Sequence, residues 1–250
     1  ILPSFHAKYA IHSNGNLRFS YARAINRPSF FEIVPYSIIN EDYKEKGNPE
    51  LKHTVADNID LRYEFFPRSS EQLMVGLFYK NIKDPIEYGL LNEGQDTYYK
   101  PMNFGTANNW GLEVDILKYF NWLGIKANYT YTYSKITTEK RVMQGSEVTT
   151  TTQSRPLFGQ AAHVANISFL LKDSKHGWEG QLAMGYTGKR LSDISNWADN
   201  DIWEKGYTQL DASIEKTLPR GFCLFLKASN LLNIPVLRYV HQSERTANVD

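Results

Sequence analysis

The chain has 250 residues, and its 28 basic and 27 acidic side chains leave a formal net charge of +1. This balance gives no reason to expect nucleic acid or an acidic surface as a partner. The single cysteine, Cys223, excludes an internal disulfide and a multi-cysteine metal site. The sequence contains no run of about 18 apolar residues, so it predicts no transmembrane helix.

Residues of alternating polarity dominate the chain. Mean hydropathy is −0.47, yet aromatic residues make up 14% of the chain, a combination typical of strands that are apolar on one side only. Because successive strand side chains point to opposite sides, alternation predicts β-strands rather than helices. We predict ten strands, at about residues 4–11, 16–24, 58–66, 72–80, 110–119, 124–134, 161–171, 178–187, 207–216 and 222–228.

The connections between these strands alternate between short and long. Short turns are expected at 12–15, 67–70, 120–123, 172–177 and 218–221, and long segments at 25–52, 81–109, 137–160 and 188–206. A transmembrane barrel has short turns on the periplasmic side and longer loops outside, whereas a Greek-key sandwich has no reason to obey this rule. The sequence therefore predicts an all-β fold, an antiparallel up-and-down transmembrane barrel segment.

The long segment 25–52 is expected to be irregular, whereas two other long segments are expected to contain paired or extended structure. Strand extensions are expected around residues 98–104, and the ends of 137–160 are expected to pair as a projecting hairpin. Aromatic residues lie beside the short turns, such as Phe120, Trp122 and Trp178, and near the long segments, such as Tyr79 and Tyr133. They indicate two interfacial girdles of a membrane barrel.

The strand at 58–66 shows the two faces best. Ile59, Leu61, Tyr63 and Phe65 alternate with Asn58, Asp60, Arg62 and Glu64. The polar side is too charged for a dry core, so in a barrel the apolar set is predicted to face lipid and the polar set an aqueous lumen. Glu113 and Asp115, two residues apart on another strand, are predicted to face the same lumen.

Several phrases resemble the C-terminal half of the barrel of a TonB-dependent outer-membrane receptor, especially the versions common in the Bacteroidetes. The match rests on the order and spacing of these phrases over about residues 2 to 240. They are Leu17-Arg18-Phe19-Ser20-Tyr21, Arg27-Pro28-Ser29-Phe30, Gly47-Asn48-Pro49-Glu50-Leu51-Lys52, Phe78-Tyr79-Lys80-Asn81-Ile82-Lys83-Asp84-Pro85-Ile86, Asn103-Phe104-Gly105, Gly111-Leu112-Glu113-Val114-Asp115 and Leu226-Lys227-Ala228-Ser229-Asn230-Leu231-Leu232-Asn233.

This resemblance implies a 22-stranded barrel filled by an N-terminal plug, which imports a scarce ligand with energy passed through TonB. On that interpretation residues 1–250 are a partial outer-membrane barrel domain that lacks the plug and the earlier strands. The implied location is the bacterial outer membrane. The implied partners are outer-membrane lipid, the imported small ligand (siderophore, cobalamin, glycan or similar), the TonB complex through regions absent here, and a surface lipoprotein.

The sequence offers no catalytic residues, cofactor or metal site. Its six histidines are scattered without ligand spacing, and nucleophile and phosphate-loop motifs are absent, so no enzyme is expected. Aromatic residues in the long segments, with a cationic neighbour, are the candidate ligand contacts because rings stack on sugars or siderophore rings and a charge fixes orientation. They are Tyr36, Tyr43, Tyr98, Tyr99, Trp197, Trp203 and Arg190.

Two alternatives remain open from the sequence. One is a plugless passive channel or small structural barrel, since ten is an allowed strand number. The other is a soluble carbohydrate-binding β-sandwich. That fold would require Ile59, Leu61, Tyr129 and Tyr131 to lie in one buried core between two sheets.

Overall fold

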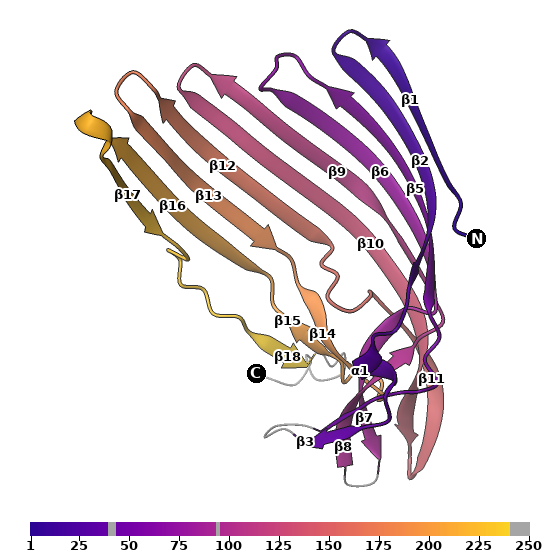
Figure 1. Cartoon of the computed structure of the whole chain (residues 1–250). Coiled ribbons are helices and arrows are strands. Elements are labelled where there is room, and N and C mark those ends of the chain that lie inside the picture. The colour runs from indigo at the N-terminus through magenta and orange to yellow at the C-terminus, as the bar shows by residue number, and fades with distance from the viewer. Residues whose placement is uncertain (40–43, 94–95, 241–250) are drawn as a thin grey trace.

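The structure is a computed structural model that describes residues 1–39, 44–93 and 96–240. A curved antiparallel sheet of eleven strands dominates the structure (Figure 1). Ten of them, here called the wall, follow one another so that each strand pairs with the next one listed, and β11 (Glu147–Arg155) pairs with β10 beside this path. The wall strands are β1 (Ser4–His12), β2 (Gly15–Asn26), β5 (Thr54–Phe65), β6 (Gln72–Lys83), β9 (Thr106–Phe120), β10 (Leu123–Gln144), β12 (His163–Asp173), β13 (Trp178–Thr187), β16 (Tyr207–Thr217) and β17 (Cys223–Ala228). The ten predicted strands and the alternation of short and long connections are confirmed.

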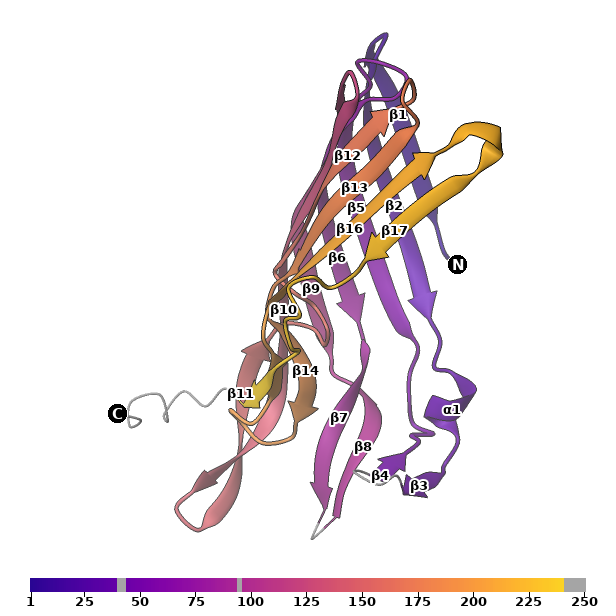
Figure 2. The ribbon, with the colours of Figure 1, turned by 90° about the vertical axis from the view of Figure 1, so that its left-hand side faces the viewer.

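The wall is an open trough rather than a closed barrel. β1 and β17 lie at its two edges and do not pair with one another in the described part of the chain. The short turns gather at one end and the long connections at the other (Figure 1). A side view shows the edge strands curving away from the middle of the sheet, which gives the trough a concave side (Figure 2). The described residues contain no helix long and apolar enough to cross a membrane.

One side of the wall carries continuous apolar rows that nothing in the described structure covers. Phe19, Leu61, Leu77 and Leu112 are cross-strand neighbours in register. The first three are 39%, 41% and 55% exposed, although large apolar side chains in a sandwich would be buried. Tyr129 is also 37% exposed. The sandwich alternative is therefore wrong. An exposed apolar face is what a membrane barrel would present to lipid, and the contact of these rows with lipid stays a prediction.

Aromatic residues border this apolar face at both ends. Tyr79 and Tyr133, toward the long connections, are 41% and 43% exposed, and Phe120 and Trp122, beside a short turn, are 55% and 56% exposed. Trp110 lies between Tyr79 and Tyr133 in register and stacks on Tyr133 with ring centroids 5.3 Å apart. Amphipathic rings at these two levels are the interfacial girdles expected of an outer-membrane barrel.

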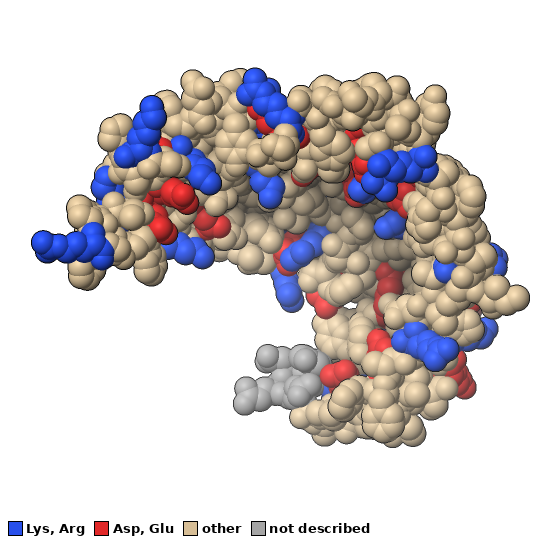
Figure 3. Space-filling model, turned by 45° about the horizontal axis from the view of Figure 1, so that its top comes forward, with Lys and Arg blue, Asp and Glu red and all other residues tan. Residues whose placement is uncertain are grey.

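The opposite side of the wall is polar and hydrogen-bonded from strand to strand. Arg18 on β2 pairs with Glu64 on β5 at 2.7 Å, and Gln72 on β6 donates to Asp115 on β9 at 2.5 Å. Phe78, which interrupts the polar pattern, lies opposite Gly111, where a Cβ atom would approach its ring to 2.6 Å. The absence of a side chain at Gly111 therefore leaves room for the Phe78 ring. Charged side chains are visible within the hollow of the trough (Figure 3).

The long connections are more ordered than the sequence predicts. Six of their strands, together with β18 (Arg238–Val240), which follows the last wall strand, form a second sheet, here called the loop sheet. Its order is β18, β15 (Ile202–Glu204), β14 (Arg190–Ser195), β7 (Ile86–Glu93), β8 (Asp96–Asn103), β4 (Lys44–Lys46) and β3 (Ser37–Ile39). The expectation of an irregular segment at 25–52 is wrong at β3 and β4. In the long connection 188–206, β14 pairs in parallel with the distant β7. The strand expected around 98–104 is β8, and the projecting hairpin is β10 with β11 (Glu147–Arg155).

The compact apolar core lies between the loop sheet and the wall. Leu191 and Ile194 of β14 are 0% and 1% exposed, and Ala107 of β9 and Ile136 of β10 are 0% and 1% exposed. Ile136 is on the same side of β10 as the polar Lys126 and Thr130, because all three positions are even-numbered in one strand. The loop sheet therefore covers the polar side of the wall at the end where the long connections meet.

Replacing Leu61 by lysine tests which side of the wall meets lipid. We expect Leu61→Lys to lower the free energy of unfolding of the full-length protein in lipid vesicles by about 2 to 4 kcal/mol, because an ammonium near the bilayer midplane loses its hydration. The matched control is Thr130→Lys, on the polar side opposite Glu113, which we expect to be tolerated. Urea titration monitored by tryptophan fluorescence measures the free energy of unfolding of both variants. If Thr130→Lys lowers it as much as Leu61→Lys does, or more, the assignment of the apolar side to lipid is contradicted.

Candidate functional site

The candidate ligand contacts lie on or beside the loop sheet, and most of them already hold partners. The Tyr36 hydroxyl donates to Glu45 at 2.9 Å; burial and this carboxylate raise the pKa of Tyr36 to about 12. Tyr98 is only 7% exposed, with the Lys46 ammonium 3.8 Å from the centre of its ring. These two rings therefore act first as packing elements of the loop sheet. Tyr43 lies outside the described residues.

Tyr99 joins this group to the other candidates. The Tyr99 hydroxyl donates to Asp193 of β14 at 2.9 Å. Asp193 lies two residues after Leu191, and Leu191 pairs with Trp203 of β15. Arg190 forms an ion pair with Glu204 at 2.7 Å, and Lys189 lies 5.5 Å from the ring centre of Trp203. The structure thus brings Tyr99, Arg190 and Trp203 into one part of the loop sheet.

Trp197 lies apart from them, in a turn against the projecting hairpin. It forms a parallel bridge with Arg141 of β10, and its backbone N–H donates to the Ser195 hydroxyl at 3.1 Å. The turn is held by backbone bonds on both sides, from Arg141 to Asn196 and from Ala198 to Arg141, each 2.8 Å long. Its indole is half-buried. Trp197 is thus part of a docked turn, and its contact with a ligand stays a prediction.

The residues predicted to face the lumen share one face of the wall. Asp60 accepts from Ser20 at 3.3 Å, and Arg62 approaches Glu113 to 3.7 Å. The Asn58 amide donates to the Ala22 carbonyl at 3.1 Å. With Glu64 and Asp115, already described, these cross-strand contacts indicate a structural role for the polar side. Their exposure to an aqueous lumen stays a prediction.

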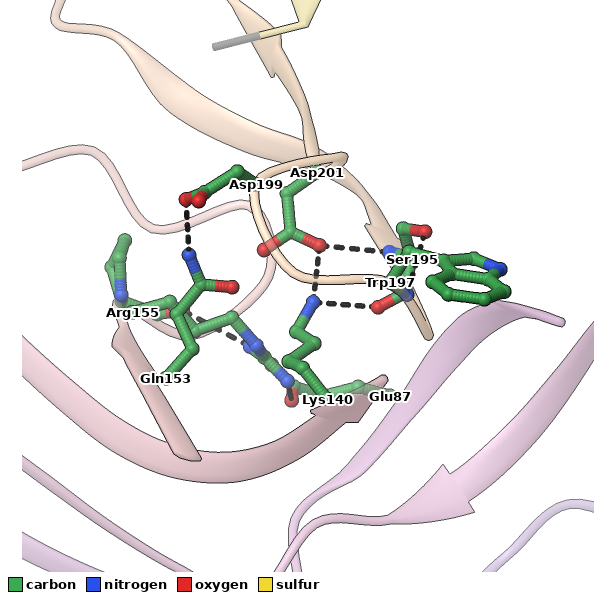
Figure 4. A network of polar contacts seen from close by, with 9 residues as sticks. Glu87, Lys140, Gln153, Arg155, Ser195, Trp197, Asp199 and Asp201 are labelled. Atoms are coloured by element: carbon green, nitrogen blue, oxygen red, sulfur yellow. Dashed lines mark hydrogen bonds and ion pairs between the residues drawn. The ribbon is translucent and has the colours of Figure 1, made fainter. Parts of the chain in front are cut away.

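A buried ion pair, which sequence reasoning missed, anchors the loop 188–206 to the projecting hairpin. The side chains of Lys140 and Asp201 are 1% and 7% exposed, and their charged atoms lie 2.5 Å apart. Lys140 also donates to the Ser195 carbonyl at 2.6 Å, and the Ser195 N–H donates to Asp201 at 2.8 Å. Figure 4 shows Lys140 rising from the strand toward the turn that carries Ser195 and Asp201. Burial lowers the pKa of Lys140, and the Asp201 carboxylate opposes that effect.

A second buried ion pair ties β7 to the same hairpin. Arg155 and Glu87 are 2% and 5% exposed, with a contact of 2.8 Å between guanidinium and carboxylate. Glu87 also accepts from the Phe158 N–H at 2.6 Å, and Arg155 lies 5.2 Å from the ring centre of Phe104. Buried charges need such partners, although the Nε atom of Arg155 is buried without a hydrogen bond. Together the two ion pairs, with the Gln153–Asp199 bond at 2.9 Å, fix the loop sheet over the end of the wall (Figure 4).

The most exposed rings of the described long connections were also missed. Phe30 and Phe31 of the helix α1 (Phe30–Ile33) are 71% and 72% exposed. Ser29 fixes the start of this helix, because its hydroxyl accepts from the Glu32 N–H while the Glu32 carboxylate accepts from the Ser29 N–H. Beside α1 lies a hollow of about 680 Å³ lined by Ile33, by other apolar residues, and by the polar or cationic Arg27 and His53. The adjacent Phe-Phe pair was the available sequence signal.

The described residues contain no group of three or more His, Cys, Asp or Glu side chains placed to hold a metal ion. Asp199 and Asp201, two neighbouring carboxylates of the loop 188–206, accept hydrogen bonds from Gln153 and Lys140. Their oxygens thus serve the loop contacts.

The curved antiparallel sheet, with one apolar and one polar side, has the fold of an outer-membrane β-barrel wall. A family model described as TonB dependent receptor-like, beta-barrel matches residues 1–231. The chain therefore belongs to the TonB-dependent receptor β-barrel family, whose members are outer-membrane transport receptors and not a family of enzymes. The Bacteroidetes-like character of the phrases stays a prediction. No curated protein sequence matches the chain significantly.

Solved structures with the same fold are siderophore receptors by their descriptions. The ferric-catecholate import receptor Fiu from E. coli K12 has a TM-score of 0.65 at 17% identity, over 92% of this chain and 30% of that one. PirA from Pseudomonas aeruginosa gives 0.64 at 17%, over 94% and 39%. A ferric enterobactin receptor variant from P. aeruginosa, in complex with enterobactin, gives 0.63 at 16%, over 92% and 35%. This chain spans about a third of their length.

Removing one member of the buried ion pair tests the anchoring of the loop. We expect Lys140→Met to destabilise the docked loop by about 3 to 5 kcal/mol, because Asp201 is left buried and unpaired. Amides of residues 190–204 should then exchange hydrogen faster, while those of β5 keep their protection. Adding Asp201→Leu should restore much of the loss, since an apolar pair has no charge to desolvate.

The control is Lys44→Met, which removes an ion pair with Asp96 whose side chains are 34% and 55% exposed. An exposed pair contributes at most about 1 kcal/mol. Unchanged exchange in 190–204 after Lys140→Met would show that the ion pair does not hold the loop.

The stability of the loop region is expected to depend on alkaline pH through the ionisation of Tyr36. Its pKa of about 12 is above the ordinary value near 10, so between these values the folded state binds more protons than the unfolded state. The contribution of Tyr36 to stability is therefore complete below pH 10 and is lost as the pH rises through 12. Absorbance at the tyrosinate band should lose a component that titrates near pH 12 in Tyr36→Phe; an unchanged titration curve would refute this.

Proposed function

We propose that this chain supplies the barrel wall and part of the extracellular face of a receptor for energised uptake of a scarce ligand. The observation that carries the proposal is the match of the family model to residues 1–231, which include the whole wall. On this proposal the apolar side contacts outer-membrane lipid, and Asn58, Asp60, Arg62, Glu64, Glu113 and Asp115 line the aqueous interior. The energy comes from TonB, acting on regions outside this chain.

A ferric siderophore is the ligand class that we propose. The support is the shared fold with receptors described as importing ferric catecholates or binding enterobactin. Phe30 and Phe31 offer exposed ring faces on a capped helix, and the adjoining hollow contains Arg27 and His53. Rings pack on the planar groups of such a chelate, and a cation compensates its negative charge.

Iron uptake by cells tests the transport step. We expect cells that express the full-length receptor to accumulate iron from a ferric siderophore, and deletion of tonB to abolish the accumulation. Uptake that persists without TonB would instead indicate a passive channel. If the receptor binds ferric siderophores but the cells accumulate iron from none of them, the proposed ligand class is rejected. Import of a glycan or of cobalamin would then remain to be tested.

Ring removal tests the proposed contact. We expect Phe30→Ala with Phe31→Ala to weaken binding of the ferric siderophore by at least about tenfold, since losing ring burial costs at least about 1.4 kcal/mol. Phe120→Ala is the matched control, because Phe120 is similarly exposed, at 55%, but lies beside a short turn. Equal dissociation constants for the receptor and the double variant in a fluorescence titration would exclude these rings as contacts.

A further inference from the structure

Four polar side chains gather on the outward, apolar side of the wall, just beyond the aromatic girdle at the end that bears the long connections. Side chains on one side of a strand recur at every second residue. Lys83 therefore lies on the same side of β6 as Tyr79, and Lys135 on the same side of β10 as Tyr133. With two neighbours on the strand between them they form a set, here called the donor cluster, which contains Lys83 of β6, Thr106 and Asn108 of β9, and Lys135 of β10.

The donor cluster joins three adjacent strands in the middle of the wall. Lys83 pairs in register with Thr106, and Asn108 pairs with Lys135. Since β6 and β10 both pair with β9, their backbones lie about 9 to 10 Å apart. Both lysines are exposed, and each carries its ammonium on a flexible four-carbon stem. The two ammonium groups can therefore reach one anion seated over β9.

Asn108 presents hydrogen-bond donors at the same place. Its side-chain oxygen accepts from the Tyr79 hydroxyl at 2.8 Å and from the Asn81 amide at 2.9 Å. An asparagine side chain has one acceptor oxygen and two N–H donors, so Asn108, with its oxygen occupied, has only donors to offer. The exposed Thr106 adds a hydroxyl. The donor cluster is therefore suited to a group that carries acceptor oxygens.

The charge around the donor cluster is positive. The carboxylate that lies opposite Asn81 in register is Asp57 of β5, and Arg23 already holds it through two hydrogen bonds of 2.8 and 2.9 Å. Arg23 and Asp57 thus cancel, whereas neither Lys83 nor Lys135 forms an ion pair in the described part of the chain. Farther out on β10, the exposed side chains at 139 and 141 have opposite charges and add no net charge.

We propose that the donor cluster binds the phosphate group of an outer-membrane lipid. This inference rests on the proposed contact of the apolar side with lipid. The exposed apolar rows continue directly below the girdle, so a lipid whose chains lie on them holds its headgroup at the level of the donor cluster. Cations at this level attract anionic headgroups, and phosphate oxygens accept strong hydrogen bonds from ammonium groups. A free phosphate ion lacks the chain contact, which favours the lipid.

Native mass spectrometry of the purified full-length receptor in an uncharged detergent tests this site. With phosphatidic acid and phosphatidylcholine added at equal concentrations, we expect the receptor to retain phosphatidic acid in preference. Lys83→Gln and Lys135→Gln should each raise the dissociation constant for phosphatidic acid about tenfold, since each removes a charge-assisted hydrogen bond. Lys126→Gln is the matched control, because Lys126 is an exposed lysine of β10 on the polar side of the wall, and it should leave this constant unchanged.

Three outcomes would overturn the proposal. They are equal retention of the two lipids, equal weakening by all three substitutions, and displacement of phosphatidic acid by an equal concentration of inorganic phosphate, which would mark a site for the free ion. Heat-modifiable migration on a gel shows that each variant is folded, so loss of binding is separable from loss of structure. Neither TonB nor a siderophore enters the measurement, so its failure is distinguishable from a failure of iron uptake.

Discussion

The structure depends on pairing every backbone N–H and C=O of a chain that lies in hydrocarbon. Each unpaired group there costs several kcal/mol, so the strands must form an uninterrupted ladder. That ladder also aligns side chains in rows that cross many strands, as in the row from Phe19 through Leu61 and Leu77 to Leu112. Because neighbours in a strand alternate between sides, one ladder separates an apolar surface from a polar one without a second layer.

A consequence is that the wall has no core of its own. The deeply buried apolar residues Leu191, Ile194 and Ile136 lie where the loop sheet covers the polar side of β9 and β10. Packing of the kind found in soluble proteins is thus confined to the end that bears the long connections. There the buried pairs Lys140–Asp201 and Glu87–Arg155 join loops that are distant in sequence. This small packed region holds the long connections in place at their end of the wall.

The wall could be predicted from the sequence because its signal is local. Alternation within nine or ten residues assigns a strand and its two faces, and errors fall at the ends: the third wall strand begins at Thr54 rather than Asn58. The loop sheet could not be predicted in this way. β14 and β7 pair in parallel at only two positions, Ile194 with Gly89 and Ser195 with Leu90. The two strands are about 100 residues apart in sequence, so no local sequence pattern predicts that they pair.

The same limit applies to the candidate contacts. Exposed-looking rings such as Tyr98 and Tyr99 were identified by their position in a long segment, but their partners Lys46 and Asp193 come from other segments. The freedom of a ring to meet a ligand is therefore a property of loop packing. Phe30 and Phe31 are exposed although their ring centroids lie only 6.0 Å apart, because little else in the described part of the chain packs on them.

Three lysines of β10 show how position determines the role of a residue in this fold. Lys126 is exposed on the polar side, Lys135 follows the aromatic Tyr133 on the apolar side, and Lys140 is buried under the loop 188–206. A single strand therefore passes from a polar surface through an interfacial girdle into a protein core. The first two lysines keep their hydration, whereas Lys140 depends on Asp201 for its charge. The position of a lysine along the strand, and the side of the sheet on which it lies, thus decide whether its charge is hydrated at the surface or needs a buried partner.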